Sequence, residues 1–185
     1  METVENRGRS VSWAAALLLG AAVAVGLGVY GRLHEPGSVA LYTLGFSGQL
    51  PMKAWLSTVV LIFAVLQVVT ALWMWGRLPG VGTAPAWVGP VHRWSGTIAF
   101  VVSLPVAFAC LWTLGFRSGD VRVLVHSIAG CLFYGAFAAK MIGLRLRAAP
   151  RWALPVLGGT AFTLIVLLWL TSALWLFTTP GSAKI

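Results

Sequence analysis

Residues 54–76 read AWLSTVVLIFAVLQVVTALWMWG, an uncharged and mostly apolar stretch bounded by Lys53 and Arg77. An apolar run of about 18 residues or more is long enough to cross the hydrocarbon core of a bilayer as a helix. Similar runs lie on both sides of it, and together they predict helices at about residues 11–30, 54–76, 92–116, 121–144 and 152–177. We therefore expect an all-α membrane protein, a five-helix transmembrane bundle in which residues 1–185 form a single membrane domain.

The composition excludes several classes of protein. Of the 185 residues, 59% are apolar and 9% are charged, whereas about 25% are charged in a soluble protein. The net charge of +9 does not indicate nucleic-acid binding, because the basic residues flank apolar runs and form no continuous basic face. No acidic residue lies within an apolar run, which argues against proton pumps and carboxylate-driven cation symporters; the acids are Glu2, Glu5, Glu35 and Asp120.

The distribution of basic residues predicts the orientation. The first run is longer than the apolar part of a signal peptide, so we expect it to be retained as a membrane anchor. With five passes, one side collects Arg7, Arg9, Arg77, Arg93, Lys140, Arg145, Arg147 and Arg151, and the other collects Arg32, Lys53, Arg117, Arg122 and Lys184. The more basic side is expected to be cytoplasmic. This places the N-terminus in the cytoplasm and the C-terminus outside, in an integral protein of the inner (plasma) membrane.

The cysteines exclude some kinds of site. The sequence contains no C-x-x-C-H motif, so covalent attachment of a c-type haem is excluded, and no C-x-x-C pair that would indicate a zinc or thioredoxin-like site. Cys110 and Cys131 both lie within apolar runs. We expect them to be buried, inert thiols.

Two histidines occur in the same local pattern, V-H-x-x-x-G. The first copy contains His92 and Gly96, and the second contains His126 and Gly130. In a helix each glycine lies one turn beyond its histidine on the same face. A neutral imidazole is a good ligand of haem iron, and a glycine beside it allows a planar macrocycle to approach the helix. Small residues also serve helix packing, and a histidine near the end of a run can face water; for His92 this alternative stays open.

The two histidines cannot bind the same iron. Measured from the turn between their helices, they differ by 18 residues, or about 27 Å of depth at 1.5 Å per residue. Each would need a second ligand at its own depth, and histidine with methionine is an acceptable axial pair. The candidates are His34 and Met52 on the outer side and Met74 and Met141 on the cytoplasmic side. These methionines are also interpretable as packing residues.

The arrangement of helices and histidines resembles that of known membrane proteins. Five helices with short loops and histidines on consecutive inner helices resemble transmembrane b-type cytochromes, which move electrons from ascorbate or quinol, and ferric-reductase-like haem membrane domains. More specific stretches resemble a family of small, uncharacterised actinobacterial multi-pass membrane proteins; they are KAWL (53–56), WVGPVHRWSG (87–96), VLVHS (123–127), FYGAF (133–137) and WLTSALW (169–175).

The resemblance implies haem b, but the ligand set is incomplete. Dihaem cytochromes of this type use four histidines, and the position about 17 residues after His92, where another is expected, is Ala109. A single outer haem would be completed by His34 or Met52, would be five-coordinate on His126, or would take a ligand from a partner subunit.

Two hypotheses follow from these observations. The first is a b-type haem-binding membrane subunit that relays electrons between quinol, or a redox partner, and an acceptor. The second is a non-catalytic membrane scaffold or accessory subunit of a redox or respiratory complex, suggested by the missing histidine ligands and by small residues on the first run. Expected partners are membrane lipid, quinone, and a redox partner subunit or second copy of the chain, with no nucleic acid. Whether the protein is an enzyme is left open.

Overall fold

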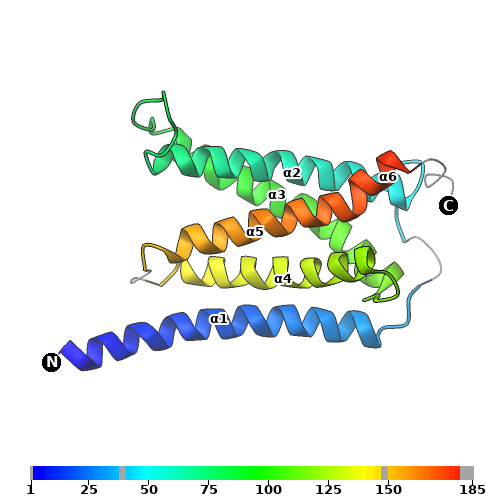
Figure 1. Ribbon diagram of the computed structural model, residues 1–185, viewed down its shortest axis with the longest axis horizontal. Helices are drawn as coiled ribbons and strands as arrows, with labels where there is room; N and C mark the ends of the chain where they lie inside the picture. The colour runs from blue at the N-terminus through cyan, green and yellow to red at the C-terminus, as the bar shows by residue number, and fades with distance from the viewer. Residues whose placement is uncertain (1, 38–40, 147–149, 180–185) are drawn as a thin grey trace.

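The computed structural model describes residues 2–37, 41–146 and 150–179, with side chains from Trp13 onward, and these residues form helices and connecting segments without a strand (Figure 1). The elements in chain order are α1 (Glu2–Leu33), α2 (Gln49–Met74), α3 (Val88–Ala109), η1 (Cys110–Leu114), α4 (Val121–Gly143), α5 (Ala153–Trp169), η2 (Leu170–Leu174) and α6 (Trp175–Thr178). They provide five stretches long and apolar enough to cross a membrane. The predicted five-helix, all-α membrane fold is therefore confirmed. Arg147 and Lys184, which entered the prediction of orientation, lie outside the described residues.

The ends of the first two helices differ from the predicted ones. The helix α1 begins at Glu2 rather than near residue 11. The apolar run predicts only the part of the helix that is suited to lipid, and the helical backbone extends beyond it into polar sequence. The helix α2 begins at Gln49 rather than at residue 54, with Pro51 in its first turn, where a missing N–H costs little. It ends at Met74 because Gly76 adopts a φ of +63°, a left-handed conformation that commonly terminates helices.

The fourth helix starts where the sequence predicts. Asp120 is in an extended conformation at its N-terminus, and its side chain accepts a hydrogen bond of 3.1 Å from the backbone N–H of Arg122. Such a cap satisfies one of the N–H groups that a helix leaves without an internal partner.

The helices form a layered bundle (Figure 1). The helix α3 packs antiparallel to α2, α5 packs antiparallel to α4 and also contacts α2, and α1 lies along α4. We call one end of the bundle the His126 end, where α1, α3 and α5 finish and α2 and α4 begin. The opposite end, where α3 begins, is the His92 end.

Small residues bring α1 and α4 close together. A Cβ added to Gly20 would lie 2.5 Å from the backbone oxygen of Gly135, and one added to Gly135 would lie 2.6 Å from the backbone oxygen of Gly20 and 2.8 Å from Cβ of Ala24. Close approach of backbones through glycine and alanine is a common basis of helix association in membranes. The first helix is thus held against the bundle chiefly through α4.

Two helices change to π-helical geometry near the His126 end. The helix α3 continues into η1, which begins five residues after Pro105, and α5 continues into η2. The segment before α2 and the start of α2 contact α3 and η1. The hydroxyl of Tyr42 donates a 2.6 Å hydrogen bond to the carbonyl of Pro105, and the amide of Gln49, the first residue of α2, donates to the Thr113 hydroxyl at 3.0 Å.

Candidate functional site

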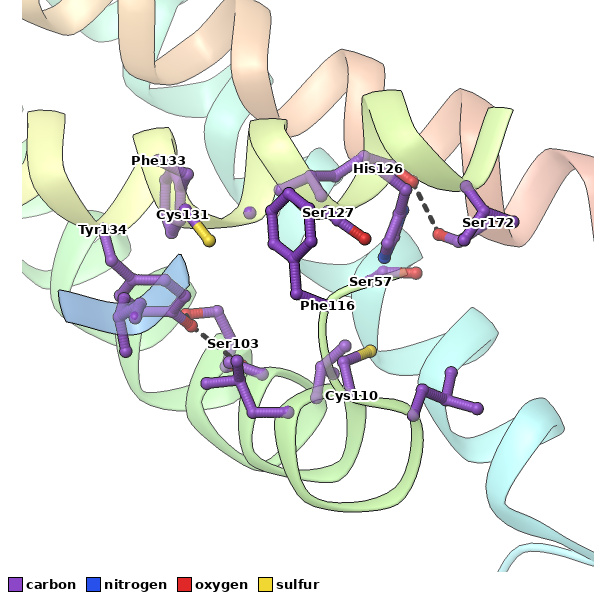
Figure 2. Close-up of a pocket in the computed structure, with 18 of the residues that line it drawn as sticks. Ser57, Ser103, Cys110, Phe116, His126, Ser127, Cys131, Phe133, Tyr134 and Ser172 are labelled. Carbon is purple, nitrogen blue, oxygen red and sulfur yellow. Dashed lines mark hydrogen bonds between the residues drawn. The ribbon is translucent and has the colours of Figure 1, made fainter. Parts of the chain in front are cut away.

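A cavity of about 320 Å³ lies among the helices at the His126 end (Figure 2). Its walls come from α2, α3, η1, α4, α5 and η2, with Leu27 from α1. Most of the lining side chains are apolar, and a few polar and sulfur-bearing ones also line it: Ser57, Ser103, Cys110, Arg117, His126, Ser127, Cys131, Tyr134 and Ser172. A largely apolar cavity with a few converging polar groups is the usual form of a small-molecule or cofactor site. We call it the His126 cavity.

The ring of His126 is held in one orientation by η2. Its Nδ1 lies 3.0 Å from Oγ1 of Thr171, and the Thr171 hydroxyl lies 2.6 Å from the carbonyl oxygen of Leu167, to which it donates. Because the hydroxyl proton is used in that bond, the Thr171 oxygen accepts a hydrogen bond from Nδ1–H of His126. Nε2 is then the unprotonated nitrogen, and no described residue forms a hydrogen bond to it. Figure 2 shows the ring extending from α4 toward Ser57 of α2.

The helix surface beside His126 is open. Gly130 lines the same cavity one turn along α4, and a Cβ added to it would have a single described atom within 4 Å, Cδ2 of Leu168 at 3.8 Å. This is an ordinary van der Waals contact. The glycine therefore leaves free space next to an imidazole whose Nε2 carries a lone pair.

Both π-helical segments contribute to the site. The segment η1 supplies Cys110, Leu111 and Leu114 to the cavity wall, and η2 supplies Ser172 and positions Thr171 against the His126 ring. The wider turn of a π-helix changes the direction in which side chains point, and such segments are frequent at functional sites. The apolar pattern of the sequence carries no signal for either segment.

The second histidine has the same kind of partner at the other end of the bundle. Nδ1 of His92 lies 2.8 Å from the hydroxyl of Thr70, which donates a 2.7 Å hydrogen bond to the carbonyl of Leu66. Along α3, His92 precedes Cys110 of the His126 cavity by 18 residues, or about 27 Å at 1.5 Å per residue. The two histidines therefore lie at opposite ends.

Our expectation of a bare surface beside His92 is wrong. A Cβ added to Gly96 would lie 3.0 Å from Oε1 and 3.3 Å from Nε2 of Gln67, and the Gln67 amide donates hydrogen bonds to the His92 carbonyl and to the Ser95 hydroxyl. The glycine thus serves the close packing of α2 on α3, because an amide bonded to α3 occupies the space that a macrocycle would need.

The proposed second ligands do not line the His126 cavity. His34 lies between Tyr30 and Trp112, with ring centroids at 5.2 and 4.7 Å, and its Nε2 is 3.2 Å from the Trp112 carbonyl oxygen. Met52 is completely buried elsewhere on α2. At the His92 end, Met74 and Met141 are exposed.

The cavity also contains residues that the sequence did not assign to the haem site. Cys110, which we expected to be inert, projects from η1 into the cavity across from α4 (Figure 2). The Tyr134 hydroxyl lies 2.9 Å from the Ser103 hydroxyl and 3.1 Å from the Ser103 carbonyl. Within the described part of the chain, no three histidine, cysteine or acidic side chains converge as they would for a metal ion held by protein ligands alone.

Comparisons with known proteins identify the family but no activity. No curated protein and no solved structure matches the chain, so the likeness to b-type cytochromes and ferric-reductase-like domains rests on the residues alone. The model of a family described as "Family of unknown function (DUF6529)" matches residues 13–184, almost the whole chain and all of the His126 cavity. The chain therefore belongs to the DUF6529 family.

Proposed function

We propose that the protein is a b-type haem-binding membrane subunit that relays electrons between quinol, or a redox partner, and an acceptor, with one haem held at His126. The observation that carries this proposal is the Nε2 lone pair of His126, oriented by Thr171 and adjoining an apolar cavity next to Gly130. Haem would supply one-electron redox chemistry at its iron, while the chain supplies ligation, burial and orientation.

The residues of the cavity fit such a group. Histidines that bind metals usually donate their other ring N–H to a fixed acceptor, and the Thr171 hydroxyl is that acceptor for His126. The cavity volume of about 320 Å³ is at the lower end of the roughly 300–1,000 Å³ common for ligand sites. The wall residue Phe116 also borders a separate, shallower hollow of about 490 Å³ along α1.

One haem fits the chain better than two. The Gln67 amide covers the helix surface beside His92, whereas Gly130 leaves that surface open beside His126. Any second ligand would come from Cys110, which lines the same cavity, or from a partner subunit. Thiolate, like imidazole, is an established ligand of haem iron.

We also propose the predicted orientation, with the N-terminus in the cytoplasm of the inner (plasma) membrane. The His126 end then faces outside. This orientation is supported by the larger number of basic residues near the ends of the apolar runs on the side that contains the N-terminus.

The proposal is tested by the absorption spectrum of the full chain. Protein purified in mild detergent from a haem-replete host is expected to show Soret and α bands in the dithionite-reduced minus oxidised spectrum, and a pyridine haemochrome assay is expected to give about one haem b per chain. A folded, monodisperse protein without these bands would overturn it. A haem-free protein that co-purifies with a membrane redox complex would instead support the accessory-subunit alternative.

Thr171→Val is expected to weaken haem binding about 10–100-fold, the usual effect of removing the hydrogen-bond partner of a ligating histidine. Valine is similar in shape to threonine but cannot accept the proton of His126 Nδ1. The measurement is the dissociation constant from spectral titration of the haem-free protein. Thr171→Ser, which keeps the hydroxyl, should retain most of the affinity, as should Thr70→Val at the His92 end. Unchanged affinity in Thr171→Val would show that Thr171 does not position a ligand.

Gly130→Leu is expected to leave the fold intact and to reduce haem binding at least tenfold. The added Cβ meets Leu168 at an ordinary distance, and the rest of the leucine side chain would occupy the surface beside His126. Haem content and size-exclusion profile together measure the two effects. In contrast, Gly96→Leu should lower stability without acting on the haem site, since it displaces the Gln67 amide. A Gly130→Leu protein with full haem content would place the ligand elsewhere.

A further inference from the structure

Basic side chains gather around the His126 cavity at the His126 end. Arg117, in the segment after η1, is exposed and lines the cavity. Lys53 lies one turn before the cavity residue Ser57 on α2, and so on the same face, although only 8% of its surface is exposed. Arg122 lies one turn before His126 on α4. Arg117 thus lines the cavity, while Lys53 and Arg122 do not line it but each lie one helical turn before a residue that does.

The segment that carries Arg117 is fixed to α4. The backbone N–H of Arg117 donates to the Ser127 hydroxyl at 3.3 Å, and that hydroxyl lies 3.2 Å from the Arg117 carbonyl oxygen. Nε of Arg117 donates to the Leu114 carbonyl at 3.1 Å. These bonds leave the terminal nitrogens of the guanidinium without a described hydrogen-bond partner. The position of the charge at the cavity edge is therefore set by the backbone.

Arg122 already has its partners. Its Nη1 donates to the Thr171 carbonyl at 2.6 Å, its guanidinium lies 4.1 Å from the centre of the Trp175 ring, and its Nε is 3.8 Å from a carboxylate oxygen of Asp120. This is the one ion pair formed between described residues. Neither Lys53 nor Arg117 has a described carboxylate within ion-pair distance. An anionic group from a ligand at this end would therefore meet two basic side chains that have no described ion-pair partner.

We propose that Arg117 and Lys53 bind the carboxylates of the ligand in the His126 cavity, which for haem are its propionates. This inference rests on the proposed function, since it takes haem as the ligand. A haem has an apolar body with carboxylates on one edge, which matches an apolar cavity with basic residues at one end. Hydrogen bonds between a guanidinium or ammonium and a carboxylate are about twice as strong as neutral ones.

The test compares haem b with its dimethyl ester, whose propionates carry no charge. Both are titrated spectroscopically into the haem-free full chain, and the wild type is expected to bind haem b at least tenfold more tightly than the ester. Arg117→Gln should weaken binding of haem b about tenfold, the typical value of a hydrogen bond to a charged group, and should leave the affinity for the ester unchanged. Lys53→Gln should act in the same way. Because Arg117 is exposed, its variant serves even if the buried Lys53 proves necessary for folding.

Arg93→Gln, at the His92 end, is the matched control and should leave the preference for haem b intact. Equal affinities of the wild type for haem b and its ester would overturn the carboxylate assignment while leaving the haem proposal standing. An equal loss of preference in Arg93→Gln would also overturn it, because the effect would then reflect net charge. Failure of both ligands to bind would overturn the proposed function itself.

Discussion

His126→Ala is expected to abolish the haem spectrum, whereas His92→Ala leaves it unchanged. Both histidines follow valine, precede a glycine by four residues and bond a threonine through Nδ1. Only His126 lines the His126 cavity. Removing a residue that only supports an iron ligand usually lowers affinity 10–100-fold. Removing the ligand itself is expected to have a larger effect, a loss of haem affinity of at least 100-fold. Haem content per chain after purification measures this directly.

Two controls separate loss of ligation from loss of folding. In His126→Ala the Thr171 hydroxyl keeps its bond to the Leu167 carbonyl, so the size-exclusion profile should match that of the wild type. Added imidazole fits the space left by the missing ring and should restore the haem bands in His126→Ala. A spectrum that survives in His126→Ala without imidazole, or is lost only in His92→Ala, would show that the haem is assigned to the wrong histidine.

Gly135→Val is expected to separate α1 from α4 and to lower the free energy of unfolding by about 1–3 kcal/mol, the usual cost of inserting atoms into a packed interface. The reason is geometric: even a Cβ at this position would lie 2.6 Å from the backbone oxygen of Gly20 and 2.8 Å from Cβ of Ala24. Neither a backbone carbonyl nor an alanine has a flexible side chain that can move aside. The midpoint of thermal unfolding in detergent should fall by about 2–4 °C for each kcal/mol.

Gly26→Val is the matched control on α1. No described atom lies within 4 Å of a Cβ added there, so the midpoint should remain within about 1 °C, given that surface substitutions usually change stability by no more than about 0.5 kcal/mol. If Gly135→Val unfolds at the wild-type temperature, the contact between α1 and α4 is not what holds the first helix.

The two histidine sites are related, and one residue distinguishes them. The residue three positions before the partner threonine faces the glycine in each case: Gln67 lies over Gly96, and Leu168 lies beside Gly130. The Gln67 amide bonds to the adjoining helix and fills its space. The Leu168 side chain makes an ordinary apolar contact and leaves a cavity. The same backbone motif thus gives a packed helix pair at one end and an open site at the other.

The candidate site could be predicted only in part. The V-H-x-x-x-G pattern led to His126 and Gly130, because both residue types and the period of a helix are visible in one stretch of sequence. The pattern did not connect His126 with Thr171, which bonds its ring from η2, or with Cys110, which lines the cavity from η1. His34 and Met52 were plausible partners by depth, but depth does not determine which face of a helix a residue occupies.

The sequence by itself determined the number of helices and their approximate ends. Both depend on local properties of the chain: the length of each apolar run, a capping side chain and a terminating glycine. The tertiary structure alone decided which glycine faces free space and which faces a bonded amide. That difference depends on the side chain presented by a neighbouring helix, and helix neighbours are chosen by packing between segments far apart in the sequence.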